Sequence, residues 1–176
     1  MATRSIPAVA ECYAERALAE LVNKYMRTLR LRIRHRPRRG GHDRVIVTTL
    51  RGLPGHEILV LFIDYEEGRA SAAYTEQLCR EKRATLYRRR GAAILLCKTT
   101  GPGGRRVYSI VWSPRSEEAL EALAGARDSG DPKTRRRIKN NPGYVKQLLE
   151  RALIDEKPLP RAIAEALEAE LARREE

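Results

Sequence analysis

Arginine recurs at every second position in the segment LRLRIRHRPRR, residues 29–39. The alternation puts Leu29, Leu31 and Ile33 on one face of a strand and the arginines on the other, which predicts a half-buried strand. Side chains on one face of a strand are roughly 6–7 Å apart, close to the separation of phosphates along a nucleic-acid strand. The alternatives are a solvated face or a contact with an acidic protein, but crowded like charges repel and favour a polyanion. The expected binding residues are Arg30, Arg32, Arg34, Arg36, Arg38, Arg39 and Arg44.

A second basic group follows residue 79 and ends in three consecutive arginines, Arg88, Arg89 and Arg90. We expect it on the later half of a helix over residues 71–90, which stops at Gly91. These arginines are also candidates for phosphate contacts. The alternative, equally favoured by the pattern, is a favourable interaction with the negative end of the helix dipole.

Carboxylates are scarce in this basic part of the chain, and three of them lie at strand ends. Asp43 precedes the expected strand RVIVTTL, whereas Asp64 and Glu66 end the apolar run EILVLFIDYE on one face. If the two strands form a hairpin, Asp43 and Asp64 converge and could hold Mg²⁺, which takes oxygen ligands and promotes phosphodiester hydrolysis. The alternative is that these carboxylates end strands and pair with nearby arginines.

The elements that must position these groups follow from hydrophobic periodicity. We expect a helix over 7–26, strands over 29–35, 44–50 and 57–65, a helix over 71–90, strands over 92–100 and 105–112, and then helices. This αβββαββ order predicts an α/β fold with a mixed central sheet flanked by helices and a C-terminal helical extension. We therefore divide the chain into a basic α/β domain, residues 1–112, and an extension, residues 113–176, that packs on the body or forms an interface.

Charge is distributed unevenly along the 176 residues. The formal net charge is +12, and residues 1–112 hold 22 Lys or Arg against 10 Asp or Glu, while residues 113–176 hold 13 of each. The predominance of arginine suits bidentate phosphate contacts, and it is also typical of a GC-rich or thermophilic source. No apolar stretch is long enough to span a membrane and no signal peptide is evident, so we expect a cytoplasmic protein. Three cysteines are interpreted as small buried side chains, not metal ligands.

The order of motifs resembles the PD-(D/E)xK nuclease superfamily, and most closely the archaeal Holliday junction resolvases. The resemblance covers residues 8–112 and rests on Glu15 in VAECYAERALAELV, Asp43 in GGHDRVIV, and Asp64 and Glu66 in ILVLFIDYEEG. It implies that Asp43 and Asp64 hold Mg²⁺, with Glu15 and Glu66 assisting. Glu66 stands where the family has its lysine, and His42 where it has a proline. Lys98 on the next strand is the candidate to replace the missing lysine and aid the attacking water.

These observations lead to two expectations for function. The first is a nucleic-acid-binding protein, with duplex or branched DNA preferred, on a nuclease-like scaffold that either cleaves with Mg²⁺ or has lost cleavage. The alternative is a non-catalytic RNA-binding component of a ribonucleoprotein or RNA-processing complex, since LYRRRGAAILLCKTT also resembles tRNA-splicing endonuclease subunits without their catalytic histidine. The neutral C-terminal helices either pack on the sheet or bind a partner, and a homodimer would match a two-fold DNA junction.

Overall fold

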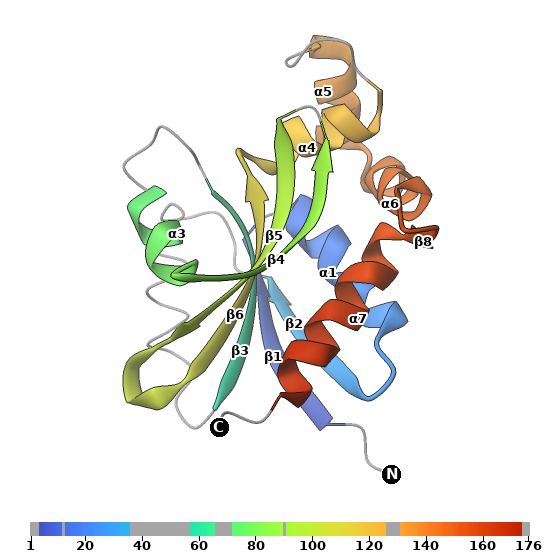
Figure 1. The fold of residues 1–176 in the computed structure, drawn as a ribbon. Helices are drawn as coiled ribbons and strands as arrows, with labels where there is room; N and C mark the ends of the chain where they lie inside the picture. Colours follow the sequence, from blue (N-terminus) through green and yellow to red (C-terminus); the bar gives the residue numbers. More distant parts are fainter. Residues whose placement is uncertain are drawn as a thin grey trace.

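The computed structural model describes residues 4–11, 13–35, 57–65, 72–89, 91–125 and 131–173. Six strands form one sheet, and the helices lie on both of its faces (Figure 1). The elements are β1 (Arg4–Ala10), α1 (Tyr13–Tyr25), β2 (Leu29–His35), β3 (Ile58–Asp64), α3 (Ala72–Leu78), β4 (Glu81–Arg89), β5 (Ala92–Thr100), a 3₁₀ turn (Pro102–Gly104), β6 (Arg106–Ser113), α4 (Ser116–Leu123), α5 (Pro132–Asn140), α6 (Pro142–Arg151), β7 (Leu153–Ile154), β8 (Lys157–Pro158) and α7 (Leu159–Ala172).

The sheet is mixed and has the strand order β2-β1-β3-β6-β5-β4. Strands β2, β1, β3 and β6 are parallel to one another, whereas β5 pairs antiparallel with both β6 and β4. The structure thus confirms the expected α/β class with a mixed central sheet, flanking helices and C-terminal helices. Within the described residues, no helix is long and apolar enough to cross a bilayer.

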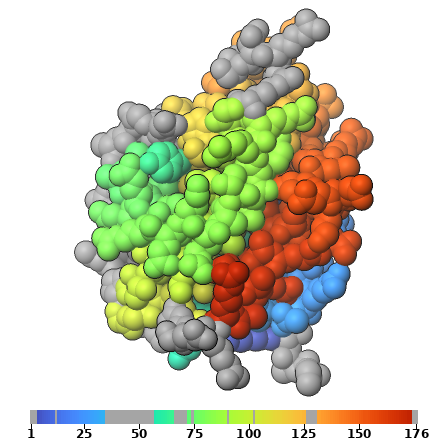
Figure 2. All heavy atoms as spheres, viewed as in Figure 1, coloured from blue at the N-terminus to red at the C-terminus, as the bar shows by residue number. Residues whose placement is uncertain are grey.

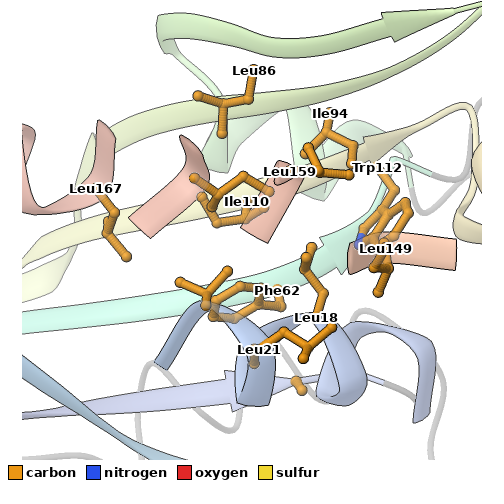
Figure 3. Close-up of a cluster of buried hydrophobic side chains, with 14 of the residues drawn as sticks. Leu18, Leu21, Phe62, Leu86, Ile94, Ile110, Trp112, Leu149, Leu159 and Leu167 are labelled. Carbon is orange, nitrogen blue, oxygen red and sulfur yellow. The ribbon is translucent and has the colours of Figure 1, made fainter. Parts of the chain in front are cut away.

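The larger core lies between one face of the sheet and helices α1, α4, α6 and α7. Phe62, Ile110 and Trp112 project from the central strands toward Leu18 of α1 and Leu149 of α6 (Figure 3). Each large apolar side chain buried in this way stabilises the fold by about 2 kcal/mol. Since α6 and α7 contribute to the same core as the sheet, the C-terminal helices pack on the body.

The opposite face of the sheet has a smaller core, in which Leu59, Leu61 and Ile63 of β3 pack with Leu78 of α3. Directly after α3, Cys79 forms a disulfide with Cys97 of β5, and their Cα atoms are 4.8 Å apart. Cys97 is buried as expected, but the covalent link was not predicted. Closing the loop of 18 residues between them stabilises the fold by about 3 kcal/mol.

The predicted helix over residues 7–26 begins later than expected, because residues 4–10 form strand β1. The segment IPAVA is buried throughout, since β1 lies between β2 and β3, and such a strand shows no alternation. Pro7, which we took for a helix start, cannot donate a backbone hydrogen bond. The pairing of β1 with β3 begins one residue later, at Ala8, so the proline costs that ladder no bond.

The second error concerns residues 81–89, which form strand β4 and not the second half of a helix. The helix α3 ends at Leu78, and Gly91, with φ +79°, makes the turn between β4 and β5 and not a helix stop. Pairing with β5 along nearly its whole length outweighs the helical preference of this segment. The register shifts twice, which broke the alternation expected of a strand.

Candidate functional site

Four carboxyl groups converge where the parallel strands β1 and β3 end. Glu11 follows β1, Asp64 ends β3, Glu15 lies in the first turn of α1, and Glu117 lies in the first turn of α4. The strand order reverses at β1, which lies between β2 and β3. In open α/β sheets, ligands bind at such a reversal, in the crevice outside the carboxyl ends of the strands. We call these four residues the carboxylate cluster.

Asp64, at the end of β3, is hydrogen-bonded to Glu11, to α3 and to α4. Its backbone N–H donates to Oε2 of Glu11 at 3.1 Å, and the hydroxyl of Thr75 in α3 donates to its carbonyl oxygen at 3.2 Å. At the start of α4, Ser116 donates its backbone N–H to Oδ1 of Asp64 at 2.8 Å and its hydroxyl to Oδ2 at 3.3 Å. An acceptor at the start of a helix satisfies a backbone donor that has no partner within the helix. The carboxyl group of Asp64 therefore fixes the end of β3 against α4.

The protonation state of this cluster follows from its burial. Burial raises the pKa of Asp64 to about 11, and the charge of Glu15, a hydrogen bond with Glu15 and the charges of Glu11 and Glu117 act in the same direction. Glu15 is fully buried. Two carboxyl groups in contact cannot both be ionised cheaply, so one proton belongs to the pair. We therefore expect the pair of Asp64 and Glu15 to hold one proton in neutral solution.

The structure brings together two of the five residues that we predicted to be catalytic. Glu15 and Asp64 meet, while Asp43 and Glu66 lie outside the described residues. Since Mg²⁺ was expected between Asp43 and Asp64, that pairing stays a prediction. Among the described residues, no group of three or more His, Cys, Asp or Glu side chains has an arrangement suited to a metal ion.

Lys98, the fifth predicted catalytic residue, lies away from the cluster. Asp64 is opposite Trp112 of β6, which in turn is opposite Ile94 of β5. Lys98 is opposite Tyr108, and thus lies four residues further along β5, which is about 13 Å from the level of Asp64. The structure therefore does not position this lysine to aid a water molecule at Asp64.

The predicted arginine strand is confirmed as β2, an edge strand of the sheet. Leu31 is buried and Leu29 and Ile33 are half-buried, whereas Arg30, Arg32 and Arg34 are exposed. The guanidinium of Arg30 donates to the carbonyl oxygens of Asn23 and Met26, at 3.2 and 2.7 Å, and so caps the end of α1. Arg32 and Arg34 are the members of this strand that present their charge to solvent. The predicted contacts of Arg36, Arg38, Arg39 and Arg44 lie outside the described residues.

A groove on the other edge of the sheet was not predicted. It consists of three hollows of about 450, 660 and 550 Å³; the first two share Arg89, Leu123, Ala152 and Leu153, and the last two share Arg137. Strand β4 forms one wall, and the end of α4, helices α5 and α6 and strand β7 form the rest. Figure 2 shows β4 beside the C-terminal helices on this face. We call it the basic groove; its arginines are Arg88, Arg89, Arg136, Arg137 and Arg151.

Helix α5 is strongly basic, although the charge balance over residues 113–176 did not reveal it. Its nine residues, PKTRRRIKN, include five Lys or Arg and no acidic residue. The balance of 13 against 13 over residues 113–176 averaged this helix with acidic helices around it. Of the predicted binding residues, Arg88 and Arg89 line the groove, and Arg90 lies outside the described residues.

The basic groove differs from the surface around α1 and α7 in how its charges are paired. On that surface, cations contact carboxylates closely: Lys146 contacts Glu20 of α1 at 2.7 Å, and Lys157 contacts Glu165 of α7 at 2.6 Å. Within the part of the chain that the structure describes, none of the five groove arginines forms an ion pair with a carboxylate. Five positive charges therefore line this groove without a close carboxylate partner, although Asp155 also belongs to its lining.

No family model matches the chain, and comparison with curated proteins and with solved structures finds no match either. The resemblance to the PD-(D/E)xK nucleases therefore stays a prediction from the sequence. Any function has to be inferred from the geometry and charge of the sites described above.

Proposed function

We propose that this protein binds nucleic acid, with DNA preferred, through the phosphate backbone at the basic groove. The observation that carries the proposal is that Arg88, Arg89, Arg136, Arg137 and Arg151 line one groove without ion-pair partners among the described residues. Arginines binding phosphates displace the counterions that surround a nucleic acid, which makes binding favourable at low salt. The resemblance to DNA nucleases supports DNA as the preferred form.

The exposed arginines of β2 provide a second contact surface. Arg32 and Arg34 lie on the opposite edge of the sheet from β4, five strands away, which is about 24 Å across the sheet. They are therefore too far away to bind the same few phosphates as the groove. We assign the main contact to the groove, because there the arginines come from several elements and line a hollowed surface.

The test is fluorescence anisotropy with labelled duplex, four-way junction and single-stranded DNA and with structured RNA, measured over a series of salt concentrations. We expect Arg88→Gln with Arg89→Gln to weaken binding about tenfold at 0.1 M salt. The slope of log affinity against log salt should become about 2 units shallower, one for each lost phosphate contact.

A matched control removes the same charge elsewhere. Lys157 and Arg161 both contact Glu165, at 2.6 and 3.1 Å, on the helical side of the molecule. The variant Lys157→Gln with Arg161→Gln should bind almost as well as the unmodified protein. Equal losses in the two variants would mean that net charge and not the groove determines binding. Absence of binding to all four probes would overturn the proposal.

Metal-dependent cleavage of branched DNA is a second candidate function. The observation that favours it is that Glu15 and Asp64, from two different elements, meet at the ends of the parallel strands as the resemblance implies. As the resemblance implies, Asp64 would hold the cation together with Asp43, with Glu15 assisting, and the cation would polarise the phosphate when bound. The test is incubation of a four-way junction with Mg²⁺ or Mn²⁺. Cleavage that is absent in Asp64→Asn would support this activity, and an intact junction with both metals would exclude it.

A further inference from the structure

We infer that the basic groove takes a single strand of nucleic acid and stacks at least one base on the paired side chains of Arg137 and Tyr144. This inference rests on the proposed function and specifies the form of nucleic acid that the groove accepts. The guanidinium carbon of Arg137 lies 3.9 Å from the centre of the Tyr144 ring, so the two planar groups are in contact. Both residues line the middle hollow of the groove.

The surface around this pair is unlike a surface that contacts only phosphates. Leu123, Leu148, Ala152 and Leu153 line the middle hollow beside the arginines. Leu153 is 62% exposed and is the one large apolar side chain that is exposed in the described part of the chain. Apolar and aromatic groups contribute nothing to phosphate binding, but they stabilise the faces of unstacked bases.

The arrangement of charge around the platform fits one strand. Arg88 and Arg89 lie on the β4 side, while Arg151, at the end of α6, lies on the side of the C-terminal helices. Phosphates of a strand in the groove can therefore contact arginines on both walls while a base reaches Arg137. In a duplex, the base faces are covered by their neighbours and cannot stack on a side chain without disruption of the helix. The groove thus favours a strand whose bases are unpaired.

The size of the hollows agrees with this occupant. Volumes of about 450 to 660 Å³ lie in the range of sites that hold small organic molecules, and each hollow can accept a nucleotide. An acidic peptide would satisfy the arginines, but its carboxylate side chains offer no planar group to the Arg137–Tyr144 platform, whereas each nucleotide carries both a phosphate and a base. Charge together with stacking therefore favours a nucleic-acid strand.

The experiment separates stacking from charge. The probes are a labelled 12-nucleotide oligothymidine, the same length of duplex, and an abasic strand that keeps the phosphates and lacks the bases. Arg137→Lys keeps the charge and removes the planar guanidinium, and Tyr144→Leu keeps an apolar side chain and removes the ring. Each change should weaken binding of oligothymidine about fivefold to tenfold, with the salt slope unchanged. Binding of the abasic strand should be weaker than that of oligothymidine and insensitive to both changes.

Two control variants match these changes. Tyr144→Phe retains the ring and should bind like the unmodified protein. Tyr25→Leu removes a ring that also lies under a cation, since the Nζ atom of Lys24 is 5.5 Å from its centre, but on α1 away from the groove. It should leave binding unchanged. Circular dichroism and thermal unfolding of each variant show whether the fold is retained.

The outcomes distinguish the inference from the proposed function. One contradicting result is that duplex binds as tightly as oligothymidine and that Arg137→Lys and Tyr144→Leu change neither affinity. The inferred stacking would then be wrong, although the protein would still bind nucleic acid as proposed. If polyglutamate displaces oligothymidine as well as unlabelled oligothymidine does, the groove recognises charge alone and the inference also fails. If no nucleic acid binds at all, both the inference and the proposed function are wrong.

Discussion

The carboxylate cluster and the basic groove both crowd like charges, but they deal with the repulsion in different ways. In the cluster, Asp64 and Glu15 are withdrawn from water, and the proton that we expect them to share removes one of the charges. In the groove, the arginines stay in contact with solvent, and water and salt ions screen their charges. Repulsion there is reduced by salt and, as we propose, by the phosphates of a bound strand.

The difference shows which kind of perturbation each region responds to. A proton is supplied by the solvent and its retention depends on pH, so the cluster should respond to pH and little to salt. Phosphates come from a ligand and compete with ions, so the groove should respond to salt and little to pH. The experiments below test this separation, from the largest expected effect to the smallest.

The largest effect should come from Asp64→Asn. A raised pKa means that the folded protein retains a proton that the unfolded chain loses above the ordinary pKa of 3.8. Stability from this group is fully present below that pH and falls as the pH rises toward about 11. Asparagine imitates the protonated form but does not titrate, so the variant should be more stable than the unmodified protein. The difference in the free energy of unfolding should grow by as much as about 1.4 kcal/mol for each unit that the pH rises. Urea unfolding from pH 5 to 9, followed by the fluorescence of Trp112, measures it.

Asp131→Asn provides a control of opposite sign. Asp131 accepts hydrogen bonds from Thr134 at the start of α5, and these bonds lower its pKa. Its contribution is present above the ordinary pKa and is lost as the pH falls through the lowered value. The variant should therefore be less stable than the unmodified protein at neutral pH, with the difference disappearing in acid. If both variants showed the same dependence on pH, the proton shared in the cluster would be excluded.

The second effect is stabilisation by a ligand of the groove. Oligothymidine at a free concentration 100 times its Kd should stabilise the folded protein by about 2.7 kcal/mol. For a chain of this length the midpoint of thermal unfolding should rise by about 5–10 °C. The shift should disappear in 0.5 M salt and in Arg88→Gln with Arg89→Gln, and it should persist in Asp64→Asn. Loss of the shift in Asp64→Asn would show that the carboxylate cluster and the basic groove are coupled, and it would contradict their separate responses to pH and salt.

The smallest effect is relief of repulsion in the free protein. Arg136 on α5 has Lys133 and Lys139 three residues away on either side, and like charges at this spacing destabilise a helix. Arg136→Gln should therefore raise stability by about 0.3 kcal/mol in low salt. Arg16→Gln should have the opposite effect, since Arg16 contacts Glu20 one turn later at 2.8 Å. Thermal unfolding at 20 and 500 mM salt measures both, and both differences should shrink in high salt.

The sequence predicted the elements whose patterns are local. Strand β2 was recognised because Leu29, Leu31 and Ile33 alternate with arginines, and β3, β5 and β6 because they are apolar runs between turn residues. Strand β1 was missed because it is buried and contains a proline. Strand β4 was missed because its bulges break the alternation and its residues also suit a helix. In both strands, pairing with distant segments outweighs local preference.

The candidate sites were predictable only in part, for a similar reason. The meeting of Glu15 and Asp64 was expected from a resemblance, but Ser116 and Glu117 join them from a segment assigned to the helical extension. The basic groove combines Arg89 with Arg137 and Tyr144, which are far apart in sequence. A count of charge over the last 64 residues averaged helix α5 to zero. A shorter window of charge along the chain would have identified this helix, though not its position beside β4.

The mixed sheet has a consequence for the order in which the protein folds. Strands β4, β5 and β6 are consecutive in the chain and pair as neighbours, so their contacts close short loops. The contacts of β3 with β6, and of β1 with β3, join segments that are distant in sequence and form more slowly. We expect the antiparallel half, which includes one wall of the groove, to form in the folding transition state. The parallel half, with the shared proton at its end, should be assembled later, so substitutions in β1 should mainly accelerate unfolding.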